Sequence, residues 1–172
     1  MEDILTSIIG IAIAAILMFI FPLMSMSDRT DDVSQLTVDI ATNEFADEVR
    51  LAGKITADAY NKYIENLGST GNTYNVEIEV GVLDENPSRK SIQSNSDDTE
   101  KLYYSVYTSQ IENTLNKKGT YYLKEGDIIT VSAKNTNQTI AQQLKNFFYT
   151  VVGSEIYTIA SSHSGMVIAT GS

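Results

Sequence analysis

Cysteine and tryptophan are absent from this chain of 172 residues, and histidine occurs once. Without cysteine the chain has no disulfide framework, no thiolate metal site and no cysteine nucleophile. A zinc site with a single histidine would need mostly carboxylate ligands, which is atypical of zinc. These absences exclude thiol redox chemistry and argue against zinc-dependent catalysis, so we expect no metal centre.

Positive charge is also scarce. Lysine and arginine total 12 against 22 aspartates and glutamates, which gives a net charge of −10. Such a chain repels a phosphate backbone, so nucleic acid is not expected as a partner. Gly68, Gly71 and Gly81 lie in no phosphate-binding pattern, because neither Gly-Lys-Ser/Thr nor Gly-x-Gly-x-x-Gly surrounds them. No cofactor is predicted.

The longest feature that is present is an uncharged run over residues 4–27, ILTSIIGIAIAAILMFIFPLMSMS, called the apolar segment below. As a helix it would extend about 36 Å, enough to cross a hydrocarbon core about 30 Å thick. A secretory signal peptide would have a basic start and a shorter apolar stretch, whereas this run follows Glu2 and Asp3. We therefore expect a membrane-spanning helix that is retained.

Small and polar residues interrupt the apolar segment, and they allow helices to approach closely. They are Thr6, Ser7, Gly10, Ala12, Ala14 and Ala15. Pro22 then removes a backbone donor, which bends or loosens a helix. Two readings stay open, an ordinary anchor with a kinked exit or a helix that packs between subunits.

Beyond the apolar segment the pattern predicts helix, turn and helix, followed by a strand. Apolar residues at spacings of three and four predict a helix over 33–52, with Gly53 as its C-terminal cap. Thr56 is the expected N-cap of a second helix over 57–67. Alternation of apolar and polar residues predicts a strand over 74–80.

The second half of the chain is expected to hold a polar loop over 84–100, a helix over 102–115 and a hairpin of 121–123 with 128–132. An amphipathic stretch over 139–149 should turn Ile140, Leu144 and Phe147 or Phe148 inward. A terminal hairpin of 156–160 with 166–169 should enclose a turn at His163. The predicted fold class is α+β, with a helical part over 1–52 and a globular head of antiparallel strands and short helices over 53–172.

Few residues in the head suggest chemistry. His163 is read as a turn residue, because neighbouring serines do not by themselves make a catalytic triad. Two acidic groups, Asp28, Asp31 and Asp32, and Asp97, Asp98 and Glu100, lack the spacing of a calcium loop and are read as solvated. Asn137 begins a sequon that matters only in a glycosylating host. The tyrosines at 60, 63, 103, 104, 107, 121 and 122 are interpreted as residues that pack in the core and between subunits rather than as a ligand-stacking site.

The apolar segment, the proline near its outer end and the amphipathic continuation together resemble a type IV pilin or pilin-like subunit. Two parts of the chain resemble small pilin-like proteins of Gram-positive tight-adherence (Tad-type) systems. They are the segment 38–80 and the stretch from Tyr107 through Gly126 and Asp127 to the predicted terminal hairpin. In mature pilins the family proline falls at about the depth of Pro22. The resemblance then implies either that Met1 follows a removed leader or that an equivalent start is encoded directly.

One position departs from the family. Pilins usually carry a glutamate at position 5 that pairs with the N-terminus of a neighbouring subunit, and this chain has Leu5, with Glu2 and Asp3 as possible substitutes. The residues expected to form the membrane and filament helix are Ile4, Leu5, Ile8, Ile9, Ile11, Ile13, Ile16, Leu17, Phe19, Ile20, Phe21 and Pro22.

The resemblance implies a non-enzymatic structural subunit of an extracellular filament on a bacterial surface. It would sit in the cytoplasmic membrane before assembly and have copies of itself and the pilus assembly machinery as partners. The head would be exposed for adhesion or surface contact. The alternative is a single-pass accessory protein, a minor pseudopilin of a secretion or conjugation apparatus. A tethered binding domain or an enzyme is less favoured.

Overall fold

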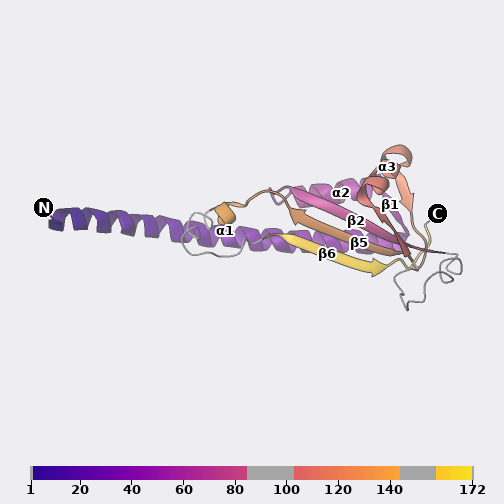
Figure 1. Ribbon diagram of the computed structural model, residues 1–172, viewed down its shortest axis with the longest axis horizontal. Coiled ribbons are helices and arrows are strands. Elements are labelled where there is room, and N and C mark those ends of the chain that lie inside the picture. The colour runs from indigo at the N-terminus through magenta and orange to yellow at the C-terminus, as the bar shows by residue number, and fades with distance from the viewer. Residues whose placement is uncertain (1, 85–102, 144–157, 172) are drawn as a thin grey trace, which may run out of the picture. The chain divides into compact units, whose positions relative to one another are not determined.

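The computed structural model describes residues 2–84, 103–143 and 158–171. The chain divides into two compact units, residues 1–34 with 138–158 and residues 35–137 with 159–172. The second is called the head unit below. The long helix α1, Glu2–Ala52, contributes to both (Figure 1). A long N-terminal helix with antiparallel strands and short helices confirms the predicted α+β class.

The head unit contains two further helices and six strands. They are β1 (Lys54–Thr56), α2 (Ala57–Gly68), β2 (Tyr74–Leu83), β3 (Tyr103–Tyr107), α3 (Thr108–Lys118), β4 (Thr120–Tyr122), β5 (Ile128–Asn135) and β6 (Ala160–Met166). The strands form a two-stranded sheet, β1-β4, and a four-stranded antiparallel sheet in the order β3-β2-β5-β6.

The capping residues place the first two helices as the sequence predicts. α1 ends at Ala52, and Gly53 follows with a φ of 63° while its N–H donates to the carbonyl of Val49 at 2.9 Å. This is the left-handed cap that glycine accepts without steric cost. Thr56 caps α2, because its side chain accepts the N–H of Ala59 at 3.1 Å. Both predicted helix boundaries are confirmed to within a residue.

The helix predicted over 102–115 is wrong in its first part. Residues Tyr103–Tyr107 form strand β3, which pairs with β2, and helix α3 begins only at Thr108. Tyr103 and Tyr107 are four residues apart, and this spacing places two side chains on the same face of a strand as well as of a helix. The end of α3 is as predicted, with Gly119 at a φ of 74°.

The hairpin predicted from 121–123 and 128–132 does not form. β4 pairs instead with β1, so that Tyr121 lies opposite Ile55. β5 pairs with β2 and β6. Asp127 explains the path between them, because its buried carboxylate accepts the N–H of Lys124 at 2.8 Å and the N–H of Leu83 at 3.1 Å. The turn therefore ties the chain to β2 rather than closing a hairpin.

The predicted terminal hairpin is also wrong. Residues expected to turn form strand β6, and His163 lies opposite Val131 of β5. Side chains of α1 cover the outer edge of this strand. Gln35 bonds both the N–H of Ala160, at 3.1 Å, and its carbonyl, at 2.8 Å. Arg50 Nε donates to the carbonyl of Met166 at 2.9 Å, so both ends of the edge are occupied.

The core of the head unit lies between the helices and one face of the four-stranded sheet (Figure 1). Val38, Phe45 and Val49 of α1 are buried against Val80 of β2 and Val131 of β5. Figure 1 shows β2, β5 and β6 running side by side. The other face of the sheet carries polar side chains that alternate with the buried ones. The sheet therefore has one packed face and one open face.

Two predicted elements fall partly outside the described residues. The polar loop over 84–100 lies outside them except for Asp84, as does the stretch 144–149 of the last amphipathic segment. Residues 140–143 are helical. Ile140, expected to face inward, is 69% exposed, whereas Ala141 and Gln142 are buried. Thr139 sets this phase by accepting the N–H of Gln142 at 3.2 Å, as an N-cap does.

Candidate functional site

The apolar segment lies entirely within α1, and its large side chains are exposed. An 18-residue window within it has a mean hydropathy of 2.8, and none of that window is buried. All twelve residues predicted for this surface are exposed except Ile20, which is partly buried. The sequence prediction omitted Met18, Leu23 and Met26, which are exposed by 77%, 52% and 67%. By length and composition this is a helix that can cross a membrane.

Polar groups inside or beside the apolar segment bond to the helix itself. Ser7 Oγ donates to the carbonyl of Asp3 at 2.8 Å, and Thr30 Oγ1 donates to the carbonyl of Met26 at 3.0 Å. Such bonds to the preceding turn satisfy a hydroxyl without any partner outside the helix. Apart from the neighbours of Gly10 along α1, no residue that the structure describes has an atom within 4 Å of where a Cβ at Gly10 would lie. The face around Gly10 is therefore free for close approach by another helix.

Pro22 does not interrupt α1, which is helical on both sides of it. A proline removes one backbone hydrogen bond and is tolerated where the rest of the helix is held. α1 is therefore continuous through Pro22, and the bend predicted at this residue stays a prediction. α1 begins at Glu2, and Asp3 lies in its first turn, where a carboxylate is favoured by the helix dipole.

Asp31, read from the sequence as a solvated acid, is buried. It is 5% exposed, and its Oδ2 accepts the hydroxyl of Thr139 at 2.7 Å. Thr139 also caps the helical residues that follow it. Asp31 thus holds a structural position in the first unit. Within the described ranges, no group of three or more histidine, aspartate or glutamate residues is placed to bind a metal.

His163 lies in strand β6, not in a turn. Its Nε2 is 3.7 Å from Oδ1 of Asp47 on α1, and the same carboxylate oxygen is 2.7 Å from Nη1 of Arg50. The residues around His163 are strand neighbours whose side chains alternate between the two faces of the sheet. His163 therefore takes part in the packing of β6 against α1.

The tyrosines divide into packing residues and exposed ones. Tyr63 is buried, stacks on Phe45 with ring centroids 4.6 Å apart, and shares a hydrogen bond with Thr42 at 3.0 Å. Tyr60 donates to Glu112 at 2.6 Å, which ties α2 to α3. Tyr104, Tyr107 and Tyr122 are more than half exposed. Core packing is confirmed for Tyr63. The exposed three lie outside the core of the head unit, and their predicted packing between subunits stays a prediction.

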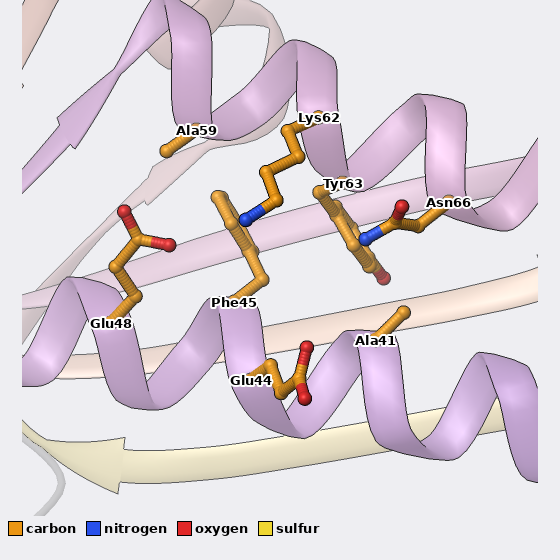
Figure 2. Close-up of a pocket in the computed structure, with 8 residues that line it drawn as sticks. All are labelled: Ala41, Glu44, Phe45, Glu48, Ala59, Lys62, Tyr63 and Asn66. Carbon is orange, nitrogen blue, oxygen red and sulfur yellow. The ribbon is translucent and has the colours of Figure 1, made fainter.

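The space between α1 and α2 is too small for a ligand. Figure 2 shows Glu44 and Glu48 on α1 facing Lys62 and Asn66 on α2, with the Phe45 and Tyr63 rings between the helices. The cavity has a volume of about 20 Å³. That volume accommodates about one water molecule. This contact therefore holds α2 to α1 rather than forming a binding site.

No protein-family model matches the chain, and neither does any curated protein or solved structure. The most extensive feature that the head core does not account for is the exposed apolar segment of α1.

Alkaline pH is expected to destabilise the head unit through its tyrosines. Burial raises the pKa of Tyr60, reinforced by the hydrogen bond to Glu112, and burial also raises the pKa of Tyr63 and Tyr121. The folded state therefore retains these protons longer than the unfolded state, in which tyrosine titrates near pH 10. This stability is present in full below pH 10 and is lost as the pH rises above it.

Urea unfolding between pH 8 and pH 11, followed by circular dichroism, measures this loss. Tyr60→Phe is expected to flatten the decline above pH 10, whereas Tyr122→Phe, at an exposed position, leaves it unchanged. If stability falls equally steeply with pH in the unchanged chain and in both variants, groups other than Tyr60 cause the loss of stability at alkaline pH.

Proposed function

We propose that the chain is a structural subunit of an extracellular pilus-like filament that assembles through its N-terminal helix. The observation that carries the proposal is α1, a single helix whose first part exposes a continuous apolar surface and whose last part supplies the core of the head unit. A soluble monomer rarely leaves such an area exposed. The apolar segment therefore needs either lipid or other copies of itself around it.

The free energy available from burial is large. About 20 apolar side chains at about 1.5 to 3 kcal/mol each amount to roughly tens of kcal/mol before entropic costs. In lipid the apolar segment is already removed from water, so assembly must rely on helix packing, which small residues favour. Gly10 and Ala14, four residues apart on α1, supply small side chains on one face of the helix. Identical contacts repeated without closure lead to a helical fibre.

The same apolar segment also suits the alternative of a membrane-anchored accessory protein. The two functions differ in what surrounds residues 4–27 at the end of the pathway. A filament subunit leaves the membrane and is recovered in fibres. An anchor remains in the membrane and is extracted as a monomer by detergent.

Electron microscopy of material sheared from cells that express the chain tests the proposal. We expect thin fibres labelled by an antibody against the head unit. Membranes from the same cells should contain the unassembled chain, which serves as the internal control for expression. Detergent-soluble monomers without labelled fibres under every growth condition would contradict filament assembly and favour the anchor.

A further inference from the structure

A groove on the open face of the four-stranded sheet lies where β3 ends and α3 begins. Its cavity volume is about 370 Å³, and it is lined chiefly by Glu77, Glu79, Tyr107, Ser109, Thr130 and Ser132. That volume falls within the range of small-ligand sites. All of these residues belong to the head unit.

The groove forms where the side chain of Thr108 takes over the backbone hydrogen bonds that a further residue of β3 would make to β2. β3 stops at Tyr107, opposite Glu79 of β2. Thr108 Oγ1 then accepts the N–H of Ile78 at 2.7 Å and donates to its carbonyl at 3.2 Å. The backbone N–H and carbonyl of Ile78 on β2 are therefore hydrogen-bonded, although the chain leaves the sheet at this point and enters α3. Glu77 has no β3 residue beside it, and a hollow remains next to it.

Two carboxylates at the groove have no cationic partner among the described residues. Glu77 Oε1 accepts from Asn75 Nδ2 at 3.0 Å, and Glu79 Oε1 accepts from Ser105 Oγ at 2.5 Å. Both partners are neutral. Because the acids are two residues apart on one strand, they share a face and lie about 7 Å apart along it. In a chain of net charge −10, a cation placed here would relieve their repulsion.

The ring of Tyr107 stands beside these acids and is 58% exposed. An aromatic face attracts a cation and also packs against the methylene groups of a lysine or arginine side chain. Thr130 and Ser132 add hydroxyls on the neighbouring strand, opposite Glu79 and Glu77 respectively. A neutral sugar would leave both carboxylate charges uncompensated.

We propose that this groove binds cationic side chains, lysine or arginine, from an extended segment of a partner protein. Cationic residues at alternate positions of an extended peptide repeat at about 7 Å, which matches the spacing of Glu77 and Glu79. One ammonium or guanidinium group pairs with each carboxylate, and the Tyr107 ring covers the stem of one of them. This site is independent of filament assembly, because it uses the head unit alone.

The test uses the full chain in detergent and an acetylated, amidated peptide of alternating lysine and threonine. Titration by NMR should shift the amide signals of Glu77, Glu79 and Tyr107, with a Kd on the order of 1 mM because exposed ion pairs are weak. Binding should weaken as salt is added. Glu77→Gln with Glu79→Gln should weaken it at least about tenfold, and Tyr107→Leu about threefold.

A matched variant separates the groove from general charge. Asp58→Asn with Glu65→Gln removes the same charge from exposed positions of α2 and should leave peptide affinity unchanged. Equal weakening in both double variants would overturn the proposal, as would a peptide that shifts no groove signal. Binding of spermidine but not the peptide would also overturn it, as would binding of chitotriose that survives the glutamine substitutions.

Discussion

Replacement of Ile8 by aspartate is expected to abolish fibres while leaving the head unit folded. Ile8 lies in the apolar segment and is 59% exposed in the single chain, so its side chain supports no part of the head core. In a filament whose core is made of these helices, an aspartate would be buried without a partner. An unpaired buried charge costs several kcal/mol per copy, and every subunit of the polymer would bear that cost.

The variant must still reach the membrane for the result to concern assembly. One aspartate at the centre of a membrane helix costs about 2.5 to 3.5 kcal/mol on insertion scales, and Ile8 lies nearer the end of the segment, where the cost is smaller. An 18-residue window of the apolar segment has a mean hydropathy of 2.8, so we expect insertion to survive. Flotation of membranes checks this, and circular dichroism with thermal melting in detergent checks the head.

Two controls fix the interpretation. Ile8→Leu keeps the apolar surface and should assemble normally. Asn61→Asp adds the same charge to an exposed position of α2 and should also assemble. Normal fibres from Ile8→Asp would mean that the apolar segment does not form the filament core. A second substitution four residues further along the same helix face as Ile8, Ala12→Asp, should repeat the loss.

Sequence patterns predicted the parts of this fold that depend on neighbouring residues. Gly53 and Thr56 act through bonds to residues three or four positions away, so the end of α1 and the start of α2 were predictable. The apolar segment was predictable because its signal is a long run of composition. Strand β2 followed from period-two alternation, although it extends to Leu83 rather than Val80.

The wrong predictions concern elements whose structure depends on residues far apart in the sequence. The pairing of β4 with β1 joins segments far apart in sequence, and the local turn at 124–127 gave no sign of it. Strand β6, ASSHSGM, has the composition of a turn. It is a strand because β5 pairs with one edge and Gln35 and Arg50 of α1 occupy the other. Tertiary contacts of this kind override local preference.

The two candidate sites, the apolar segment and the groove, also differ in how far the sequence predicts them. The apolar helix was found from sequence because each residue carries the signal by itself. The groove at Glu77 and Glu79 was missed, since it depends on Thr108 closing the β2 ladder and on Tyr107 belonging to a strand. A stretch read as helix places Tyr107 on the wrong element. Polar residues alternating along β2 were the available sign of an open sheet face.

Gly53→Ala is expected to destabilise the head unit by several kcal/mol. Gly53 has a φ of 63°, a conformation that costs other residues about 1 to 2 kcal/mol. A Cβ at this position would also collide with backbone, 2.5 Å from the N of Gly171 and closer still to the carbonyl oxygen of Ala169. Backbone atoms cannot move away as a flexible side chain can. The steric clash therefore adds to the cost of the positive φ.

The collision matters because Gly53 joins three parts of the head. Its carbonyl accepts the N–H of Leu123 at 2.8 Å, next to the β1-β4 pair, while Gly171 donates to the carbonyl of Leu123 at 3.0 Å. Moving Gly171 away from Gly53 would therefore loosen β4 as well as the cap of α1. The damage should spread to the core through Ile55 and Leu123, which are buried.

Gly68→Ala is the matched control, because Gly68 belongs to α2 and nothing lies within 4 Å of its built Cβ. Alanine stabilises a helix relative to glycine by roughly 0.5 to 1 kcal/mol. In detergent, the urea concentration at the unfolding midpoint should therefore fall for Gly53→Ala and rise for Gly68→Ala. Equal effects would mean that the backbone at Ala169 and Gly171 does not pack against Gly53, because that contact is what separates one glycine from the other.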